Sequence, residues 1–133
     1  MIVLDSSAFV DLELERANTE LVDAMARSGH WVVPEHFRVE AFNALRGTWL
    51  GRQLSDARFD HAAHRLQVLD LDVWPTAPLL PRMRELAANT TADDAAYLAL
   101  AEELACPLVT ADEKFARVPG IRCQVLGGLT PPR

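Results

Sequence analysis

The chain has 133 residues, of which 50% are hydrophobic and 24% are charged, a composition typical of one globular domain with its own core. Its net charge of −6 excludes a protein that coats nucleic acid through bulk positive charge. No apolar stretch approaches the ~20 residues of a membrane-spanning helix, and the N-terminus lacks the features of a signal peptide. We therefore expect a cytoplasmic protein without membrane association.

Strand and helix patterns alternate along the whole chain. The expected strands are short apolar runs, and the helices between them begin at Ser, Thr or Pro and repeat apolar residues every three or four positions. In chain order they are strand 1–4, helix 6–14, helix 19–27, strand 31–33, helix 35–49, helix 55–66, strand 68–74, helix 79–86, helix 91–104, strand 107–110, short helix 112–116 and strand 121–126.

Such alternation predicts an α/β fold, with a parallel sheet of about four to five strands covered by helices on both faces. Within strand 68–74, apolar residues alternate with Asp70 and Asp72, which indicates a strand at the edge of the sheet. We expect a single domain over residues 1–133, in which 127–133 form a mobile tail.

Four acidic residues stand where this fold would turn them toward one edge of the sheet. Asp5 follows the first strand and Asp112 follows the fourth, and sites in parallel sheets form beyond the C-terminal ends of the strands. Glu40 shares the apolar stripe of one helix, and Asp94 lies in the first turn of another. No basic residue immediately flanks Asp5, Glu40 or Asp94. A divalent cation is therefore the expected counter-charge, and oxygen-only ligands favour Mg²⁺ or Mn²⁺.

Each acid also has an ordinary structural explanation. Asp5 and Asp112 are common cap or turn residues, and Asp94 is the last position of a capping box. Glu40 is the hardest to explain by stability alone, because it lies within a helix on a buried stripe. The four together favour a functional site.

The other reactive side chains carry no site in this interpretation. Cys106 and Cys123 belong to no CxxC pair, so we expect buried thiols rather than a zinc site or a disulfide. The histidines show no metal-ligand spacing with an acid on a shared face; they are His30, His36, His61 and His64.

Four segments resemble, in order and spacing, those of PIN-domain ribonucleases, and most closely VapC-type toxins of bacterial toxin–antitoxin pairs. They are residues 2–8, 34–45, 91–101 and 108–112. The resemblance places four residues on the family's acidic metal-binding positions, namely Asp5, Glu40, Asp94 and Asp112. It places Ser7 and Thr110 where a hydroxyl supports the site. Asp93 departs from the family pattern, in which a less acidic residue is common, and whether it joins the site stays open.

The function implied is that of a Mg²⁺- or Mn²⁺-dependent endoribonuclease, the toxin of a pair, which binds a cognate antitoxin and forms a homodimer. In this interpretation the carboxylates hold one or two cations that activate water, and Asp94 or Asp112 accepts the water's proton. Single-stranded or looped RNA is the expected substrate, because a shallow site needs an accessible phosphate. Apolar residues near the end of the third helix, Trp49, Leu50 and Leu54, are expected to be partly exposed and to mark an interface.

Three other functions fit parts of this pattern. A non-catalytic PIN-like module that binds nucleic acid or protein would be favoured by a missing acid, but all four are present. A DNA-cleaving nuclease stays open, because the same metal chemistry serves both backbones. A phosphoacceptor receiver domain needs paired acids after its first strand, but Asp5 is followed by Ser6, and Lys114 follows Asp112 too closely.

Overall fold

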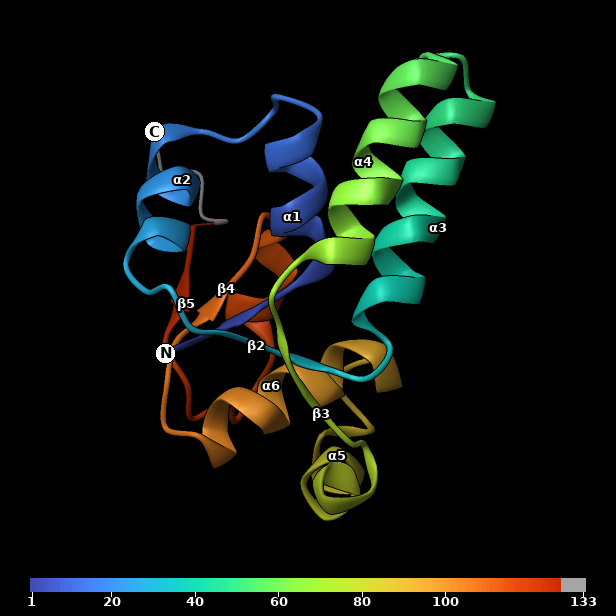
Figure 1. Cartoon of the computed structure of the whole chain (residues 1–133). Coiled ribbons are helices and arrows are strands. Elements are labelled where there is room, and N and C mark those ends of the chain that lie inside the picture. Colours follow the sequence, from blue (N-terminus) through green and yellow to red (C-terminus); the bar gives the residue numbers. More distant parts are fainter. Residues whose placement is uncertain (128–133) are drawn as a thin grey trace.

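The computed structural model describes residues 1–127, and its five strands form one parallel sheet (Figure 1). The strand order is β3-β2-β1-β4-β5, so the chain begins in the centre of the sheet and returns to its other side after β3. The strands are β1 Ile2–Leu4, β2 Trp31–Pro34, β3 Asp72–Trp74, β4 Leu108–Val109 and β5 Val125–Leu126. The predicted α/β fold with a parallel sheet is confirmed.

Helices fill every connection between the strands. They are α1 Ser6–Glu13, α2 Thr19–Ala26, α3 Phe37–Leu50, α4 Asp56–Val68, α5 Leu80–Leu86 and α6 Ala92–Glu103, with short 3₁₀ turns η1 Ala77–Leu79 and η2 Glu113–Arg117. In Figure 1, α1 and α2 lie on one side of the sheet and α5 and α6 on the other, while α3 and α4 form an antiparallel pair beside it. Within residues 1–127, no helix is long and apolar enough to cross a bilayer.

The core lies between β1 and the helices that cover it. Ile2, Val3 and Leu4 are all buried, as a central parallel strand requires. Helix α6 packs on β1, β2 and β4, and it is buried at every residue from 94 to 100. This helix is apolar on nearly all sides because it lies between the sheet and α5.

The two outer strands are shorter than predicted. Val68 ends α4 instead of beginning a strand, and only Asp72–Trp74 pair with β2, as an edge strand with exposed Asp72 and Val73. Strand β5 begins at Val125 rather than at residue 121, because β4 offers only Leu108 and Val109 for pairing. The edge position of β3 is as predicted.

Gly127, the first residue of the expected tail, is buried. Its φ is +92°, and a Cβ at this position would lie 2.8 Å from the Leu21 side chain. Both observations require glycine here. The rest of the expected tail, 128–133, lies outside the described residues.

Candidate active site

Asp5 lies at the C-terminal end of β1, and its side chain is held by two hydroxyl groups. The residue is only 4% exposed. Thr110 Oγ1 donates a hydrogen bond of 2.8 Å to Asp5 Oδ2, and Ser7 Oγ donates to the same oxygen. Ser7 Oγ in turn accepts from the Ala111 backbone N–H at 3.0 Å. Both hydroxyls that the family resemblance singled out are therefore in contact with Asp5.

Burial raises the pKa of Asp5 from its ordinary 3.8 to about 6. The Ser7 and Thr110 hydrogen bonds act in the opposite direction, and the nearby carboxylates of Glu40 and Asp94 raise the pKa further. Ionised Asp5 is therefore costly unless a cation approaches it.

Glu40 projects from the first turn of α3 toward Asp5, and one of its oxygens is fixed by two donors. Ser6 Oγ donates to Glu40 Oε1 at 2.5 Å, and Tyr97 Oη donates to the same atom at 2.9 Å. Burial and the charges of Asp5 and Glu40 raise the pKa of Tyr97, so its phenol stays protonated and remains a donor. Sequence reasoning missed both donors. Two features of the sequence could have indicated these donors. Ser6 directly follows Asp5, and Tyr97 lies three residues after Asp94 on the same face of α6.

Asp94 and Asp112 meet across a lysine that sequence reasoning did not place in the site. Lys114 Nζ lies 3.1 Å from Oδ2 of Asp94 and 3.1 Å from Oδ2 of Asp112. Burial raises the pKa of Asp94, and Lys114 acts in the opposite direction. Partial burial lowers the pKa of Lys114, but the two carboxylates outweigh it and raise that pKa. A divalent cation was the expected counter-charge, and the fold brings an ammonium group of the chain to two of the acids as well.

Asp112 also has the turn role considered for it from sequence. It is the N-cap of η2, and its Oδ1 accepts from the Lys114 backbone N–H at 3.0 Å. Its own N–H donates to Thr110 Oγ1 at 2.9 Å, which ties Asp112 to the hydroxyl that holds Asp5. Asp94 is likewise held in the first turn of α6, where its N–H donates to Thr91 Oγ1 at 3.4 Å.

The four acids thus come together from four distant segments. The charges of Glu40 and Asp94 contribute to raising the pKa of Asp5, and the charge of Asp112 contributes to raising the pKa of Asp94. A pocket of about 360 Å³ opens beside them, lined by Asp94, Lys114 and Arg117 among others. Another pocket, of about 590 Å³ between α5 and α6, is lined by none of the four.

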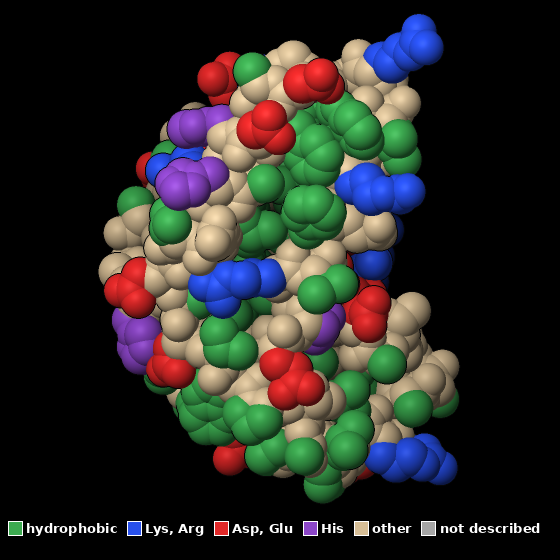
Figure 2. Space-filling model, turned by 45° about the vertical axis from the view of Figure 1, so that its right-hand side comes forward, with side chains coloured by type: hydrophobic (Ala, Val, Ile, Leu, Met, Phe, Trp, Pro, Cys, Tyr) green, Lys and Arg blue, Asp and Glu red, His purple; other side chains and the backbone are tan. Residues whose placement is uncertain are grey.

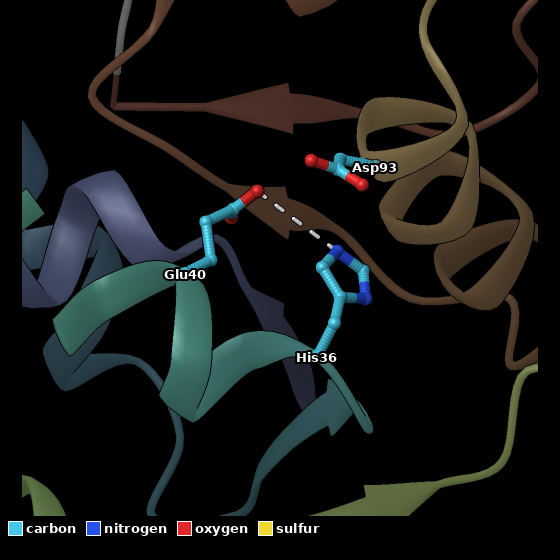
Figure 3. Close-up of side chains that lie close together, drawn as sticks. All are labelled: His36, Glu40 and Asp93. Atoms are coloured by element: carbon cyan, nitrogen blue, oxygen red, sulfur yellow. Dashed lines mark ion pairs between the residues drawn. The ribbon is translucent and has the colours of Figure 1, made fainter. Parts of the chain in front are cut away.

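One histidine lies beside the acids, against expectation. His36 Nε2 is 4.0 Å from Glu40 Oε2, and the Asp93 carboxylate lies near the same two groups (Figure 3). The i, i+4 spacing of His36 and Glu40 was the available signal, because it puts both side chains on one face of a helix. The prediction that no histidine shares a face with an acid was wrong for His36.

The sequence pattern of the PIN domain matches residues 2–121. The chain belongs to the PIN-domain family. Two curated relatives from Mycobacterium tuberculosis are similar over almost the whole chain. Ribonuclease VapC12 is 34% identical over 125 residues, which cover 94% of this chain and 97% of the relative. Ribonuclease VapC1 is 30% identical over 125 residues, which cover 92% of this chain and 94% of the relative. The chain is thus a PIN-domain protein of the VapC ribonuclease family.

Solved structures agree on the fold. The crystal structure of Mycobacterium tuberculosis VapC20, a toxin that cleaves the sarcin–ricin loop, superimposes with a TM-score of 0.63 at 17% identity, covering 98% of this chain and 100% of that one. VapBC2 from Rickettsia felis, bound to a DNA fragment from its promoter, gives a TM-score of 0.65 at 15% identity, covering 95% and 99%. At these identities the likeness concerns the PIN fold alone.

Proposed function

We propose that this chain hydrolyses phosphodiester bonds of RNA as the toxin of a toxin–antitoxin pair. The single observation that carries the proposal is the convergence of Asp5, Glu40, Asp94 and Asp112 at the C-terminal edge of the sheet. Relatives at 34% and 30% identity that carry the name ribonuclease support the reaction type.

The donor set fits a divalent cation. All four side chains offer carboxylate oxygens, and Asp5 is almost completely buried with a raised pKa. Oxygen-only ligands of this kind suit Mg²⁺ or Mn²⁺. When bound, such an ion lowers the pKa of water and stabilises the charge on the leaving oxygen.

The chain's own groups orient the carboxylates. Ser7 and Thr110 occupy Oδ2 of Asp5, while Ser6 and Tyr97 occupy Oε1 of Glu40, so each carboxylate keeps its second oxygen for other partners. Outer contacts of this kind fix ligand orientation and are worth about 10–100-fold in metal affinity or activity.

Asp112, whose side chain is 38% exposed, and Asp94, which lines the pocket, are our candidates to accept the proton of the attacking water. Lys114 is 57% exposed and has a flexible stem. We propose that its ammonium leaves the two carboxylates when a cation binds and contacts a phosphate of the RNA. The site lies at an open edge of the sheet, which favours single-stranded or looped RNA.

A cognate antitoxin and a second copy of the chain are the proposed protein partners. Apolar side chains gather over α3 and α4 in the upper part of Figure 2, and the exposed ones on α3 are Val39, Phe42, Trp49 and Leu50. Phe59 of α4 packs between Phe42 and Trp49, with ring centroids at 5.5 and 5.2 Å. Leu54, expected to be exposed, is only 5% exposed and does not contribute.

The test is cleavage of an end-labelled RNA and of a DNA strand of the same sequence by purified protein, with Mg²⁺ and with excess EDTA. We expect Mg²⁺-dependent cleavage of RNA, loss of activity in Asp5→Asn, and full activity in Asp23→Asn, which removes an exposed acid of α2. Cleavage that persists in EDTA would exclude the metal mechanism. Binding of RNA without cleavage would favour the non-catalytic module, and preference for DNA would change the substrate class.

A further inference from the structure

His36 presents a buried ring nitrogen without a hydrogen-bond partner. Its Nε2 is shielded from solvent, and among the described residues nothing accepts from it or donates to it. The ring is oriented by Tyr97, whose ring lies edge-on at a centroid distance of 5.1 Å and an angle of 63°. A buried polar atom without a partner is costly, so an atom held in this way calls for an explanation.

Glu40 directs its second oxygen at this nitrogen. Because Ser6 and Tyr97 both donate to Oε1, Oε2 is left toward His36, with its atom 4.0 Å from Nε2. That separation is too long for a hydrogen bond. It suits two ligand atoms that share a cation, each of which would bind at about 2.0–2.2 Å.

Asp93 supplies a third ligand from a different helix. In Figure 3 the side chains of His36 and Glu40, from the start of α3, and of Asp93, from the start of α6, point toward one another. Ligand atoms of the three residues all lie within 4.8 Å of one another. Asp93 is exposed, so an ion can reach this position from solvent.

We infer that His36, Glu40 and Asp93 form a second cation site, which has only Glu40 in common with the four-carboxylate centre and is suited to a first-row transition ion such as Mn²⁺. The imidazole sets its preference, because nitrogen ligands favour transition ions over Mg²⁺. The N-terminal ends of α3 and α6 are partially positive and oppose a cation. The carboxylates of Glu40 and Asp93 therefore have to supply the negative charge that attracts it. Glu40 is shared between the two sites.

The experiment counts Mn²⁺ bound to the full chain by equilibrium dialysis and electron paramagnetic resonance in the presence of millimolar Mg²⁺, which occupies the carboxylate centre. The wild type should retain one Mn²⁺ per chain. His36→Gln and Asp93→Asn should each weaken its binding at least about tenfold. His30→Gln, which changes an exposed histidine paired with Asp72, should leave the binding unchanged.

Two results would overturn the inference. One is a wild type that retains no Mn²⁺ against Mg²⁺. The other is a pair of folded His36→Gln and Asp93→Asn variants that bind Mn²⁺ as the wild type does, which would leave His36 and Glu40 as a loose ion pair. Because Asp93 is exposed, its variant guards against loss of the fold, and thermal melting verifies this.

The number of Mn²⁺ ions bound per chain is measured without RNA, so this inference and the proposed function can fail separately. A wild type that binds Mn²⁺ through His36 but cleaves no RNA would refute the ribonuclease proposal and keep the site. A wild type that cleaves RNA in Mg²⁺ but shows no Mn²⁺ binding that depends on His36 would refute the second site and keep the ribonuclease proposal.

Discussion

The ammonium nitrogen of Lys114 lies 3.1 Å from a carboxylate oxygen of Asp94. The same nitrogen lies 3.1 Å from Asp112, so one cationic side chain spans two of the four acids. In the absence of a metal ion, this contact offsets part of the repulsion between the carboxylates. It also makes Lys114 a competitor of any cation that binds there.

Replacement of Lys114 by Met should therefore tighten Mg²⁺ binding. The Lys114 side chain is 57% exposed although Asp94 is buried, and an ion pair with such an exposed partner is worth about 0.2–1 kcal/mol, which corresponds to roughly a 1.5- to 5-fold change in Kd. Isothermal titration calorimetry measures this directly. Arg117→Met is the matched control, because Arg117 lies in the same turn but pairs with Glu113. Equal Mg²⁺ affinity in the wild type and Lys114→Met would show that Lys114 does not compete.

Asp5→Asn should stabilise the metal-free protein at neutral pH. The pKa of Asp5 is raised in the folded state to about 6, so its contribution to stability is full below 3.8 and is lost as pH rises through about 6. That loss amounts to roughly 3 kcal/mol at pH 7.5. Denaturant unfolding in EDTA should show the Asp5→Asn variant gaining stability relative to the wild type between pH 5 and pH 7.5. A difference that is independent of pH would mean that Asp5 does not titrate in this range.

Asp94→Asn separates function from stability. We expect it to abolish RNA cleavage yet to melt, without metal, at the same or a higher temperature than the wild type, because burial raises the pKa of Asp94. The backbone contact to Thr91 is kept, and the Lys114 ammonium that loses this partner is 57% exposed, so water can solvate it. Added Mg²⁺ should raise the melting temperature of the wild type more than that of the mutant. Full activity together with a melting temperature several degrees lower would leave Asp94 as a helix cap only.

Tyr97→Phe removes one of the two donors that hold Glu40. The hydrogen bond runs from a buried phenol to a charged acceptor, so we expect a loss of about 1.5–3 kcal/mol in unfolding free energy. Cleavage should fall about 10–100-fold, because Glu40 is less well oriented. Ser6→Ala removes the other donor and should act in the same direction on cleavage. Unchanged cleavage in both variants would mean that the orientation of Glu40 is not limiting.

The exposed apolar surface of α3 should mediate self-association. Val39→Asp and Leu50→Asp place a charge on this surface, where the parent side chains are 75% and 54% exposed, and should shift a dimer toward monomer in sedimentation velocity. Val22→Asp, on α2, is the control, because Val22 is also exposed but lies elsewhere. A wild type that is monomeric at high concentration and does not bind its antitoxin would refute both proposed interfaces.

The order of strands and helices and the four acids of the site could be predicted from local patterns in the sequence. Its periodic apolar patterns and its Ser and Thr caps are local signals, since each depends on a few neighbouring residues. Asp5 and Asp112 could be placed at one edge because the strands before them are parallel and their C-terminal ends share that edge. Strand ends were less predictable, because pairing partners decide them, as β3 and β5 show.

The contacts that Lys114 and Tyr97 make with the acids depend on the packing of the folded chain. Lys114 is distant from Asp94 in sequence and reaches it because η2 follows β4 beside the start of α6. Tyr97 reaches Glu40 because α6 packs against the end of the sheet where α3 begins. Such contacts depend on the packing of helices over the sheet and on side-chain rotamers, which no local pattern encodes. The four acids and the hydroxyls of Ser7 and Thr110 could be placed from the sequence, whereas the Lys114 ammonium, the Tyr97 phenol and the His36 imidazole beside the acids follow from the fold.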